Sequence, residues 1–313
     1  MLALVFASYN GAAHLPKMLA ALRAIDRPAD LRIIAVDNRS TDGTREVLEE
    51  CRDDLALEIL HEPAPGKNRA LNRALAHLLP DLKPEDLVVF SDDDVLPSPD
   101  WLKALAKGAD AAPDSDFFGG TIEPVWPAPP PAWLCAIEEE HGMLYARVSA
   151  PAGPCPAATV WGPNMAVRAW VFMAGHRYDE AVGPDGSAKY AMGSEAEFLR
   201  RIERAGYRGR FVPGAVVGHM VRPHQMERAW VTERARRAGL GSDACLTQAR
   251  KLPLIQLPAW PVIGLMRARW ALLAAGLRRD EVAGLRARMS VNWHSGVIER
   301  MREIGPGARH DPA

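Results

Sequence analysis

Apolar runs alternate with helix-like segments over roughly the first 125 residues, and no other feature of the chain restricts its fold as much. The runs with the length of buried strands are LALVFAS (2–8), LRIIAVD (31–37), LALEIL (55–60) and LVVFS (87–91). The segments between them carry apolar residues three and four positions apart, which is the spacing of one helix face. This alternation predicts βαβ units, and therefore an α/β fold with a mostly parallel sheet and helices on both faces.

Polar side chains follow the predicted strands at the points where the strands end. These residues are Ser8, Tyr9 and Asn10, then Asp37, Asn38 and Ser40, and then Asp92, Asp93 and Asp94. Open sheets of this type bind ligands outside the carboxyl ends of their strands. We therefore expect the ligand site at this edge of the sheet.

The three adjacent acids Asp92, Asp93 and Asp94 repel one another, so some interaction must offset this repulsion. At the end of a buried strand they suit a hard divalent cation such as Mn²⁺ or Mg²⁺. Such an ion takes one or two protein carboxylates, with phosphate oxygens and water completing its shell. It would neutralise a diphosphate leaving group. The alternative is a polar turn before a helix, with Asp94 or Ser98 as the cap.

Two further stretches combine a strand end with a helix start. In VDNRSTDGT (36–44), Asp37 could accept a hydrogen bond from a nucleotide base or a ribose hydroxyl, although a capping role is the alternative. In HEPAPGKNRALN (61–72), Lys67 and Arg69 begin a helix, where a cation and free N–H groups suit phosphate. A solvated basic turn is the alternative for the second stretch.

The cysteines and the N-terminus bear on the cellular compartment. Cys51, Cys135, Cys155 and Cys245 are scattered, without the spacing of a metal site or of a disulfide framework. The N-terminal sequence MLALVFASYNG has no basic region before its apolar run, so it does not read as a signal peptide. We expect reduced thiols and a cytoplasmic location.

The residues after 222 differ from the rest in charge and composition. Residues 1–222 carry 23 Lys and Arg against 31 Asp and Glu, whereas residues 223–313 carry 15 against 8. The apolar segment 252–277 is interrupted by prolines and arginines, so it is a poor membrane span, which needs about 20 mostly apolar residues. We expect a basic, Trp-rich helical extension that caps the domain, pairs two subunits, or binds peripherally to the inner face of the membrane.

Seven motifs together resemble the family 2 glycosyltransferases of GT-A fold. In chain order they are FASYNG, VDNRSTDGT, GKNRALN, FSDDDVLPSPDWL, WGPNMAVR, GSEAEFLRRIERAGYRG and PGAVVGH. The resemblance covers roughly residues 1–220 and implies inverting transfer of a sugar from a nucleoside-diphosphate sugar. It implies a GT-A domain over 1–222, with a nucleotide-sugar half to about 125 and an acceptor half over about 126–222, followed by the extension 223–313.

The resemblance also implies roles for individual residues. The nucleotide side comprises Ala7, Tyr9, Asn10 and Asp37 at the base, Lys67 near the uridine or phosphate, and Asp92 and Asp93 at the ribose and the metal shell. The metal ligands are Asp94 and His219, with Mn²⁺ or Mg²⁺ as the cofactor. Trp161, Gly162 and Asn164 would flank the donor sugar and the acceptor, with core packing as the alternative for Trp161.

The catalytic base is expected in the block that starts at residue 193. The family usually has two adjacent acids here, with an arginine six residues beyond the second. Counting back from Arg201 aligns Glu195 with the second acid and Ser194 with the first, so a serine replaces one acid and Glu replaces the usual Asp. A carboxylate at Glu195 would take the proton of the acceptor hydroxyl. Glu197 is the second candidate, more typical of an acid paired with a nearby Arg or Lys.

Two other classes of function remain open at this point. A sugar nucleotidyltransferase shares the α/β layout, but it needs a Gly-rich Arg and Lys signature that FASYNGAAHLP lacks. A non-catalytic relative that binds glycan or nucleotide sugar would agree with Ser194. No nucleic-acid-binding motif accompanies the basic tail, so we expect no nucleic acid partner. The expected partners are a UDP-sugar and a glycan or lipid-linked acceptor of bacterial polysaccharide or glycolipid synthesis.

Overall fold

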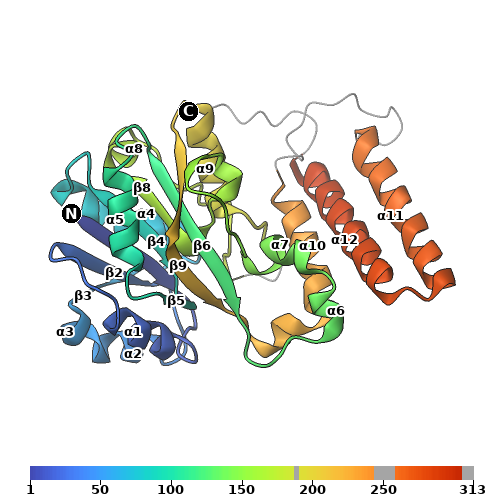
Figure 1. The fold of residues 1–313 in the computed structure, drawn as a ribbon, viewed down its shortest axis with the longest axis horizontal. Coiled ribbons are helices and arrows are strands. Elements are labelled where there is room, and N and C mark those ends of the chain that lie inside the picture. The colour runs from blue at the N-terminus through green and yellow to red at the C-terminus, as the bar shows by residue number, and fades with distance from the viewer. Residues whose placement is uncertain (187–189, 243–257, 305–313) are drawn as a thin grey trace. The chain divides into compact units, whose positions relative to one another are not determined.

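The computed structural model describes residues 1–186, 190–242 and 258–304 (Figure 1). The chain forms two compact units. The first comprises Met1–Val125, Tyr145–Gly186 and Ser194–Met220, and the second comprises Trp126–Leu144, Ser187–Gly193 and Val221–Ala313. Residues 126–144, expected in the acceptor half of the first domain, therefore group with the C-terminal helices. Cys245 and the first part of the interrupted apolar segment, 252–257, lie outside the described residues.

The first unit is built on one nine-stranded sheet with the order β3-β2-β1-β4-β8-β6-β9-β5, and β7 pairs with β9. The strands are β1 (Leu2–Ser8), β2 (Leu31–Asp37), β3 (Leu57–His61), β4 (Leu87–Asp92), β5 (Val95–Pro97), β6 (Phe117–Val125), β7 (Gly153–Cys155), β8 (Met165–Arg168) and β9 (Gly209–Met220). Strands β3, β2, β1 and β4 are parallel, as predicted. Beyond β4 the sheet is mixed, because β8 pairs antiparallel with both β4 and β6, while β9 runs parallel to β6.

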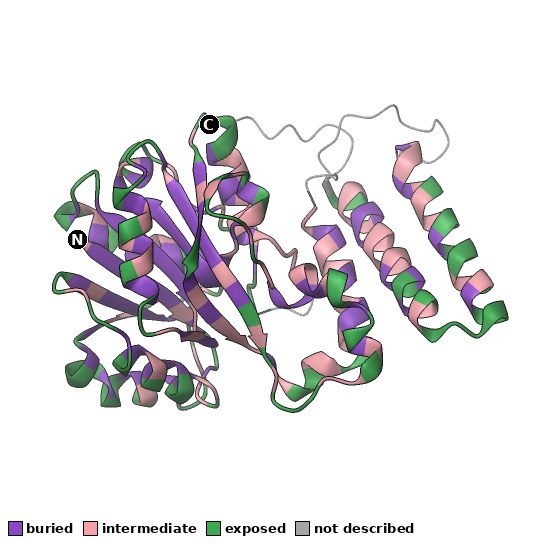
Figure 2. Cartoon of the chain, viewed as in Figure 1, coloured by how far each residue is buried: buried purple, intermediate pink, exposed green. Residues whose placement is uncertain are grey.

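Helices cover both faces of this sheet, which confirms the predicted layers. They are α1 (Leu15–Arg23), α2 (Thr44–Glu50), α3 (Arg52–Leu55), α4 (Lys67–Leu78), α5 (Trp101–Asp110), α8 (Ala169–Met173) and α9 (Ser194–Arg204). Alternate residues of β1 enter two separate cores: Phe6 packs in the core that includes Trp101 of α5, and Val5 in the core that includes Phe198 of α9. Strands β1, β2 and β4 are accordingly buried on both faces (Figure 2).

Strand register brings the polar strand ends to one place. Ala7 of β1 lies beside Asp92 of β4, and Ser8 lies beside Asp37 of β2. The short strand β5 follows the three acids and pairs with the end of β9, so that His219 lies opposite Val95. Residues from distant parts of the chain therefore meet at the carboxyl ends of the parallel strands, where open sheets bind ligands.

The second unit contains α6 (Ala132–Cys135), most of α7 (His141–Tyr145), α10 (Arg228–Leu240), α11 (Ala259–Arg278) and α12 (Glu281–Ile304). This arrangement confirms the predicted helical C-terminal extension. Helix α12 lies between α10 and α11 (Figure 1). No helix in the described part of the chain combines the length and the apolar character needed to cross a bilayer.

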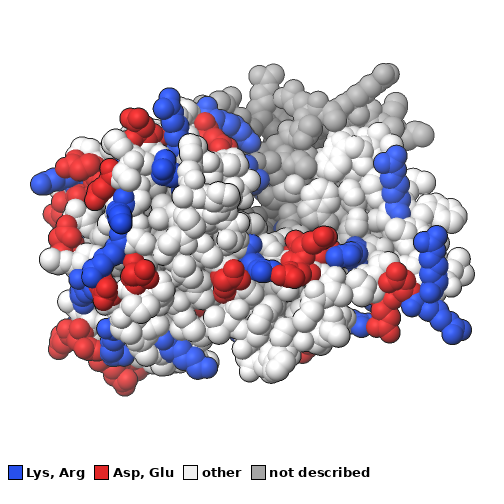
Figure 3. Space-filling model, in the orientation of Figure 1, with Lys and Arg blue, Asp and Glu red and all other residues white. Residues whose placement is uncertain are grey.

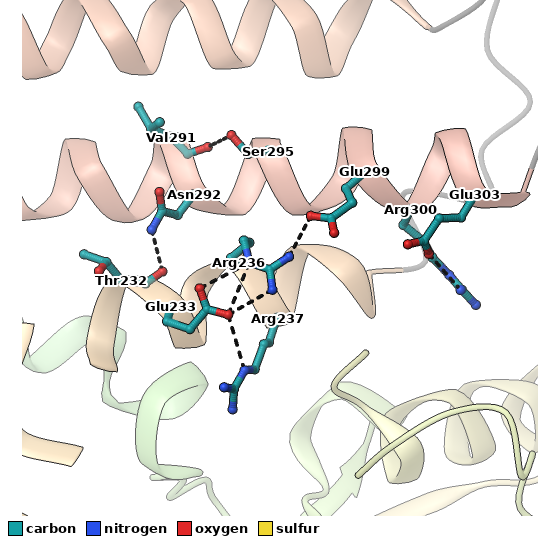
Figure 4. Close-up of polar contacts among 10 residues, drawn as sticks. All are labelled: Thr232, Glu233, Arg236, Arg237, Val291, Asn292, Ser295, Glu299, Arg300 and Glu303. Carbon is teal, nitrogen blue, oxygen red and sulfur yellow. Dashed lines mark hydrogen bonds and ion pairs between the residues drawn. The ribbon is translucent and has the colours of Figure 1, made fainter. Parts of the chain in front are cut away.

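Close backbone approach and polar contacts join α10 to α12. Arg236 of α10 donates to Glu299 at 2.6 Å, and the Asn292 side chain donates to the carbonyl of Thr232 at 2.9 Å (Figure 4). A Cβ atom at Gly296 would lie 2.1 Å from the carbonyl oxygen of Arg236. Since real Cβ atoms do not approach so closely, the two helices can pack at this distance only with glycine at that position.

We expect Gly296→Ala to destabilise the second unit, because the added methyl group must push α12 away from α10. The expected loss is about 1–3 kcal/mol in the free energy of unfolding, measured by urea denaturation. Gly276→Ala is the matched control, since a Cβ at that position of α11 meets nothing within 4 Å. Alanine there should leave stability unchanged or raise it by up to about 1 kcal/mol. Equal losses in the two variants would contradict the packing described.

Candidate functional site

Asp92, the last residue of β4, lies beside Lys67 at the first position of α4. The Lys67 ammonium donates a hydrogen bond to the Asp92 carboxylate. Burial alone would lower the pKa of Lys67, but the carboxylates of Asp92 and Glu195 raise it above its ordinary value. Burial raises the pKa of Asp92, and the charge of Lys67 opposes that shift. Lys67 thus remains a cation between two acids at the N-terminus of a helix.

Asp93 turns away from Asp92, toward the start of α1. Its carboxylate accepts a hydrogen bond from the Ser8 hydroxyl and lies 3.1 Å from Nε2 of His14. A Cβ atom at Gly11 would lie 2.6 Å from Oδ2 of Asp93, so glycine makes room for this contact. The side chain of Asp93 therefore supports the loop after β1, and the predicted contact of Asp93 with ribose stays a prediction.

Asp94 faces His219 of β9, with 3.4 Å between Oδ1 and Nε2. The other ring nitrogen of His219, Nδ1, lies 2.9 Å from the carbonyl oxygen of Tyr145. That carbonyl favours a proton on Nδ1, which leaves Nε2 as the nitrogen available to Asp94 or to a metal ion. Burial lowers the pKa of His219, but the charge and hydrogen bond of Asp94, the charge of Asp92 and the Tyr145 carbonyl together raise it, so the pKa is above its ordinary value.

Asp92, Asp94 and His219 converge as a set that could hold a metal ion. Each offers one ligand atom, and these atoms lie within 4.8 Å of one another. Two carboxylate oxygens and one imidazole nitrogen suit Mn²⁺ or Mg²⁺ better than a metal that prefers thiolate ligands. The structure brings the two predicted ligands, Asp94 and His219, together with Asp92, which was predicted with Asp93 at the ribose and the metal shell.

Glu195 lines a small pocket with Lys67, Asp92 and Gly162. It lies in the first turn of α9, where Oε2 accepts a hydrogen bond from the Ser194 hydroxyl at 3.0 Å. A Cβ atom at Gly162 would lie 3.2 Å from the Glu195 carboxyl carbon, so the absence of a side chain at Gly162 makes room for this carboxylate. Glu195 therefore lies close to Asp92 and Lys67 and lines the same small pocket.

Glu197, the second candidate for the base, lies in a different environment. Oε1 of Glu197 accepts a hydrogen bond from Nε of Arg201 at 2.8 Å, one turn further along α9. The same arginine also donates to the carbonyl of Arg177. Glu197 is thus part of an ion pair on its own helix, and it does not line the pocket that contains Glu195.

The residues predicted to contact the nucleotide base lie at the carboxyl ends of β1 and β2. Asp37 is 3 % exposed; Oδ1 accepts from the backbone N–H of Ser40 at 3.0 Å, and Oδ2 lies 3.2 Å from Nδ1 of His61. Asn10 accepts from the backbone N–H of Thr41 at 2.8 Å, which ties the loops after β1 and β2 together. Tyr9 is 51 % exposed, so its aromatic ring is accessible to a flat ligand.

Asn164 lies beneath the pocket, within the core. Its oxygen accepts from the indole N–H of Trp101 at 2.8 Å, and its amide donates to the carbonyls of Thr121 at 3.0 Å and Ala215 at 2.8 Å. Trp161, three residues earlier, is half-buried and packs against the core that contains Trp101. These contacts give Asn164 a structural role beneath the pocket, and they agree with the core-packing alternative for Trp161.

Tyr178 also lines the pocket, and sequence reasoning missed it. Its ring packs against Phe90 and Phe198, and its hydroxyl has no hydrogen-bond partner among the described residues. Burial raises the pKa of this phenol well above its ordinary value, so it stays protonated as a donor beside the acids. A lone tyrosine in a segment without a predicted element gives no sequence signal for this position.

Comparison with known proteins supports the family resemblance. Residues 4–133 match the family model described as Glycosyl transferase family 2. The predicted family resemblance is confirmed. A glucosyl-dolichyl phosphate glucuronosyltransferase of Haloferax volcanii is 28 % identical over 159 residues, which covers 48 % of this chain and 48 % of that protein. The chain thus spans about half the length of this glycosyltransferase.

Solved structures with similar folds include two complexes with nucleotide sugars. The mannosyltransferase PcManGT from Pyrobaculum calidifontis, in complex with GDP-Man and Mn²⁺, is 21 % identical with a TM-score of 0.62, covering 96 % of this chain and 86 % of that one. TarS 1–349 of S. aureus, in complex with UDP-GlcNAc, is 16 % identical with a TM-score of 0.52, covering 96 % and 91 %. These likenesses confirm the predicted GT-A fold.

The structural role of Asn164 can be tested with an isosteric change. Asn164→Asp replaces two donors by an acceptor that faces the carbonyls of Thr121 and Ala215, so we expect a loss of about 2 kcal/mol or more in the free energy of unfolding. Asn72→Asp is the matched control, because the Asn72 amide donates to the Tyr178 carbonyl at a half-buried position that water can reach. If Asn164→Asp cost no more than Asn72→Asp in urea denaturation, the hydrogen bonds of Asn164 would not have the structural role described.

Proposed function

We propose that the protein is an inverting glycosyltransferase that moves a sugar from a nucleoside-diphosphate sugar to an acceptor hydroxyl. The observation that carries this proposal is the position of Glu195, which shares one pocket with Lys67 and Asp92. A carboxylate suited to proton transfer thus lies beside the groups suited to a diphosphate. The family 2 match over residues 4–133 supports the same reaction class.

The nucleotide would bind across the ends of β1 and β2. Asp37 holds the loop after β2 and offers its buried carboxylate to a base or ribose, and Tyr9 offers an exposed ring. Asn10 shapes this rim through its contacts with the second loop, and Ala7 supplies backbone beside Asp92. Lys67, at the N-terminus of the 12-residue helix α4, suits the negative charge of the diphosphate.

Asp92, Asp94 and His219 would hold the divalent cation, Mn²⁺ or Mg²⁺, and Asp93 would support the loop beside them. When bound, such a cation supplies positive charge that stabilises the departing diphosphate. His219 is oriented for this role by the Tyr145 carbonyl, since a second contact to the other ring nitrogen fixes a ligating histidine.

Glu195 would act as the general base. The acceptor oxygen forms a bond to the anomeric carbon while the bond from that carbon to the diphosphate oxygen breaks. The proton of the acceptor hydroxyl passes to the Glu195 carboxylate, and the bonding electron pair leaves with the nucleoside diphosphate. Because the acceptor attacks from the face opposite to the leaving group, the anomeric configuration inverts. Gly162 and Trp161 would border the sugar, and Glu197 would act through Arg201 rather than on the substrate.

A UDP-sugar is our first choice of donor and a GDP-sugar the second. Solved structures of similar fold hold UDP-GlcNAc in one case and GDP-Man with Mn²⁺ in another. We propose a glycan or lipid-linked acceptor in bacterial polysaccharide or glycolipid synthesis, and a cytoplasmic location. The name of the Haloferax volcanii relative, which refers to a glucosyl-dolichyl phosphate, supports trials with a lipid phosphate acceptor.

We expect Glu195→Gln to lower turnover by about 10²–10⁴-fold, the usual contribution of a positioned general base. Binding of UDP or GDP with Mn²⁺ should remain, because the substitution leaves the diphosphate contacts intact. Turnover would be followed as release of nucleoside diphosphate from sugar nucleotides, with water as the acceptor where no other is known. Nucleotide binding would be followed by thermal shift.

Glu197→Gln is the matched control, two residues along the same helix. It removes a half-exposed ion pair with Arg201, which should cost at most about 1 kcal/mol of stability and little turnover. A large loss in Glu197→Gln with normal turnover in Glu195→Gln would move the base to Glu197. If the wild-type protein binds nucleotide sugars but neither transfers nor hydrolyses any of them, it is a non-catalytic relative and the proposal is wrong.

A further inference from the structure

Helix α11 carries an exposed apolar stripe along its length. The side chains are Ile263, Met266, Trp270, Leu273 and Leu277, with exposed fractions of 45, 56, 71, 61 and 89 %. They follow one another at intervals of three and four residues, so they lie along one side of the helix. Five of the eight large apolar side chains that are exposed among the described residues belong to this one helix. Such a concentration marks an interaction surface rather than scattered surface residues.

The stripe is distinct from the face that packs against α12. The residues of α11 buried there are small: Ala268 and Ala275 are both 5 % exposed. A Cβ atom at Gly264 would lie 2.2 Å from the His294 ring, so α11 and α12 are in close contact on that side. Trp260 meets Trp293 near the start of the helix, with ring centroids 6.3 Å apart. Helix α11 therefore has two apolar sides, and its packing against α12 buries only one of them.

The charges along α11 indicate what kind of partner fits the stripe. The helix contains no Asp or Glu. Arg267, Arg269 and Arg278 are all exposed. At about 100° per residue, Arg267 and Arg278 lie along one border of the stripe and Arg269 lies beyond the other. Figure 3 shows basic side chains at the edge of the second unit where α11 lies. The partner should thus be apolar in the middle and negatively charged at its borders.

We propose that this α11 stripe binds the interfacial region of an anionic lipid membrane. A bilayer surface offers both required properties, with acyl chains beneath a layer of charged headgroups. Trp270, in the middle of the stripe, suits the headgroup depth, and arginines beside an apolar face are typical of helices that lie in the membrane plane. From Ile263 to Leu277 the stripe is about 21 Å long at 1.5 Å per residue, which is enough to anchor a helix lying flat.

A second copy of the chain fits the stripe less well. Paired α11 helices would place arginines beside arginines along the seam, and the helix offers no acid to pair with them. Like charges at such positions oppose association. The proposal does not depend on glycosyl transfer, since it concerns the second unit alone. The vesicle measurement below needs no activity, so a failure of either proposal can be recognised separately.

The test is flotation of the full-length chain with vesicles of neutral phosphatidylcholine, or of phosphatidylcholine with 30 mol% phosphatidylglycerol as an arbitrary working composition. We expect flotation with the anionic vesicles only, and release at high salt. The stripe variant Trp270→Ser with Leu277→Ser should lose binding, because it removes the most exposed apolar groups. The charge variant Arg267→Gln, Arg269→Gln and Arg278→Gln should bind anionic vesicles about 100-fold more weakly. Each cation contributes roughly 1 kcal/mol of attraction to the surface. A loss of about 1.4 kcal/mol lowers the affinity about tenfold.

Controls on the first unit distinguish the stripe from general surface effects. Met173→Ser changes an exposed apolar side chain of α8, 43 % exposed, and should bind like the wild type. Arg27→Gln with Arg45→Gln and Lys107→Gln removes three exposed cations of the first unit and should also bind like the wild type. Equal losses in these controls would contradict a specific role for α11.

Two other outcomes would overturn the proposal. If the wild-type protein never floats but sediments as a dimer that the stripe variant converts to monomer, the partner is a second copy. If the wild-type protein neither floats nor dimerises, and the stripe variant unfolds at a lower temperature, another part of this chain covers the stripe. Either result, measured by analytical ultracentrifugation and thermal denaturation, would exclude membrane binding through α11.

Discussion

The site depends on the way in which three adjacent carboxylates are separated. Asp92 pairs with Lys67, Asp93 with Ser8 and His14, and Asp94 with His219. Each partner comes from a different element, so the mutual repulsion of the acids is relieved only when β1, α4 and β9 are all in place. The same contacts direct the side chains: two acids converge beside His219, and the third turns back to hold the loop after β1.

Much of the fold could be predicted from the sequence because it depends on local patterns. The apolar runs of β1, β2 and β4 are continuous, since both faces of these strands are buried, and their polar ends predicted the edge where Asp92, Asp94 and His219 meet. Local sequence patterns did not predict the mixed pairing in the other half of the sheet. Strand β5 is only three residues long, and its pairing with β9 joins residues more than 100 positions apart. That pairing brings His219 to Asp94.

The individual roles in the site depended on tertiary contacts that no motif encodes. The motif around WGPN suggested that Asn164 faces the ligand, yet its hydrogen bonds to Trp101 and two backbone carbonyls place it in the core. The spacing from Arg201 favoured Glu195 over Glu197, but their surroundings differ only through tertiary structure, since Glu197 pairs with Arg201 and Glu195 lines the pocket. Tyr178 reaches the pocket through aromatic packing. The exposed side of α11 could be identified only once the side that packs against α12 was known.

Anomalous diffraction from crystals grown with Mn²⁺ and UDP tests the central claim, that Asp92, Asp94 and His219 form the cation site. Data collected at the manganese absorption edge should show one strong peak within bonding distance of an Asp94 oxygen and Nε2 of His219, next to the diphosphate. In Asp94→Ala crystals that peak should disappear while the fold is retained. A bound nucleotide with no manganese at this position, or with manganese held elsewhere, would contradict the account.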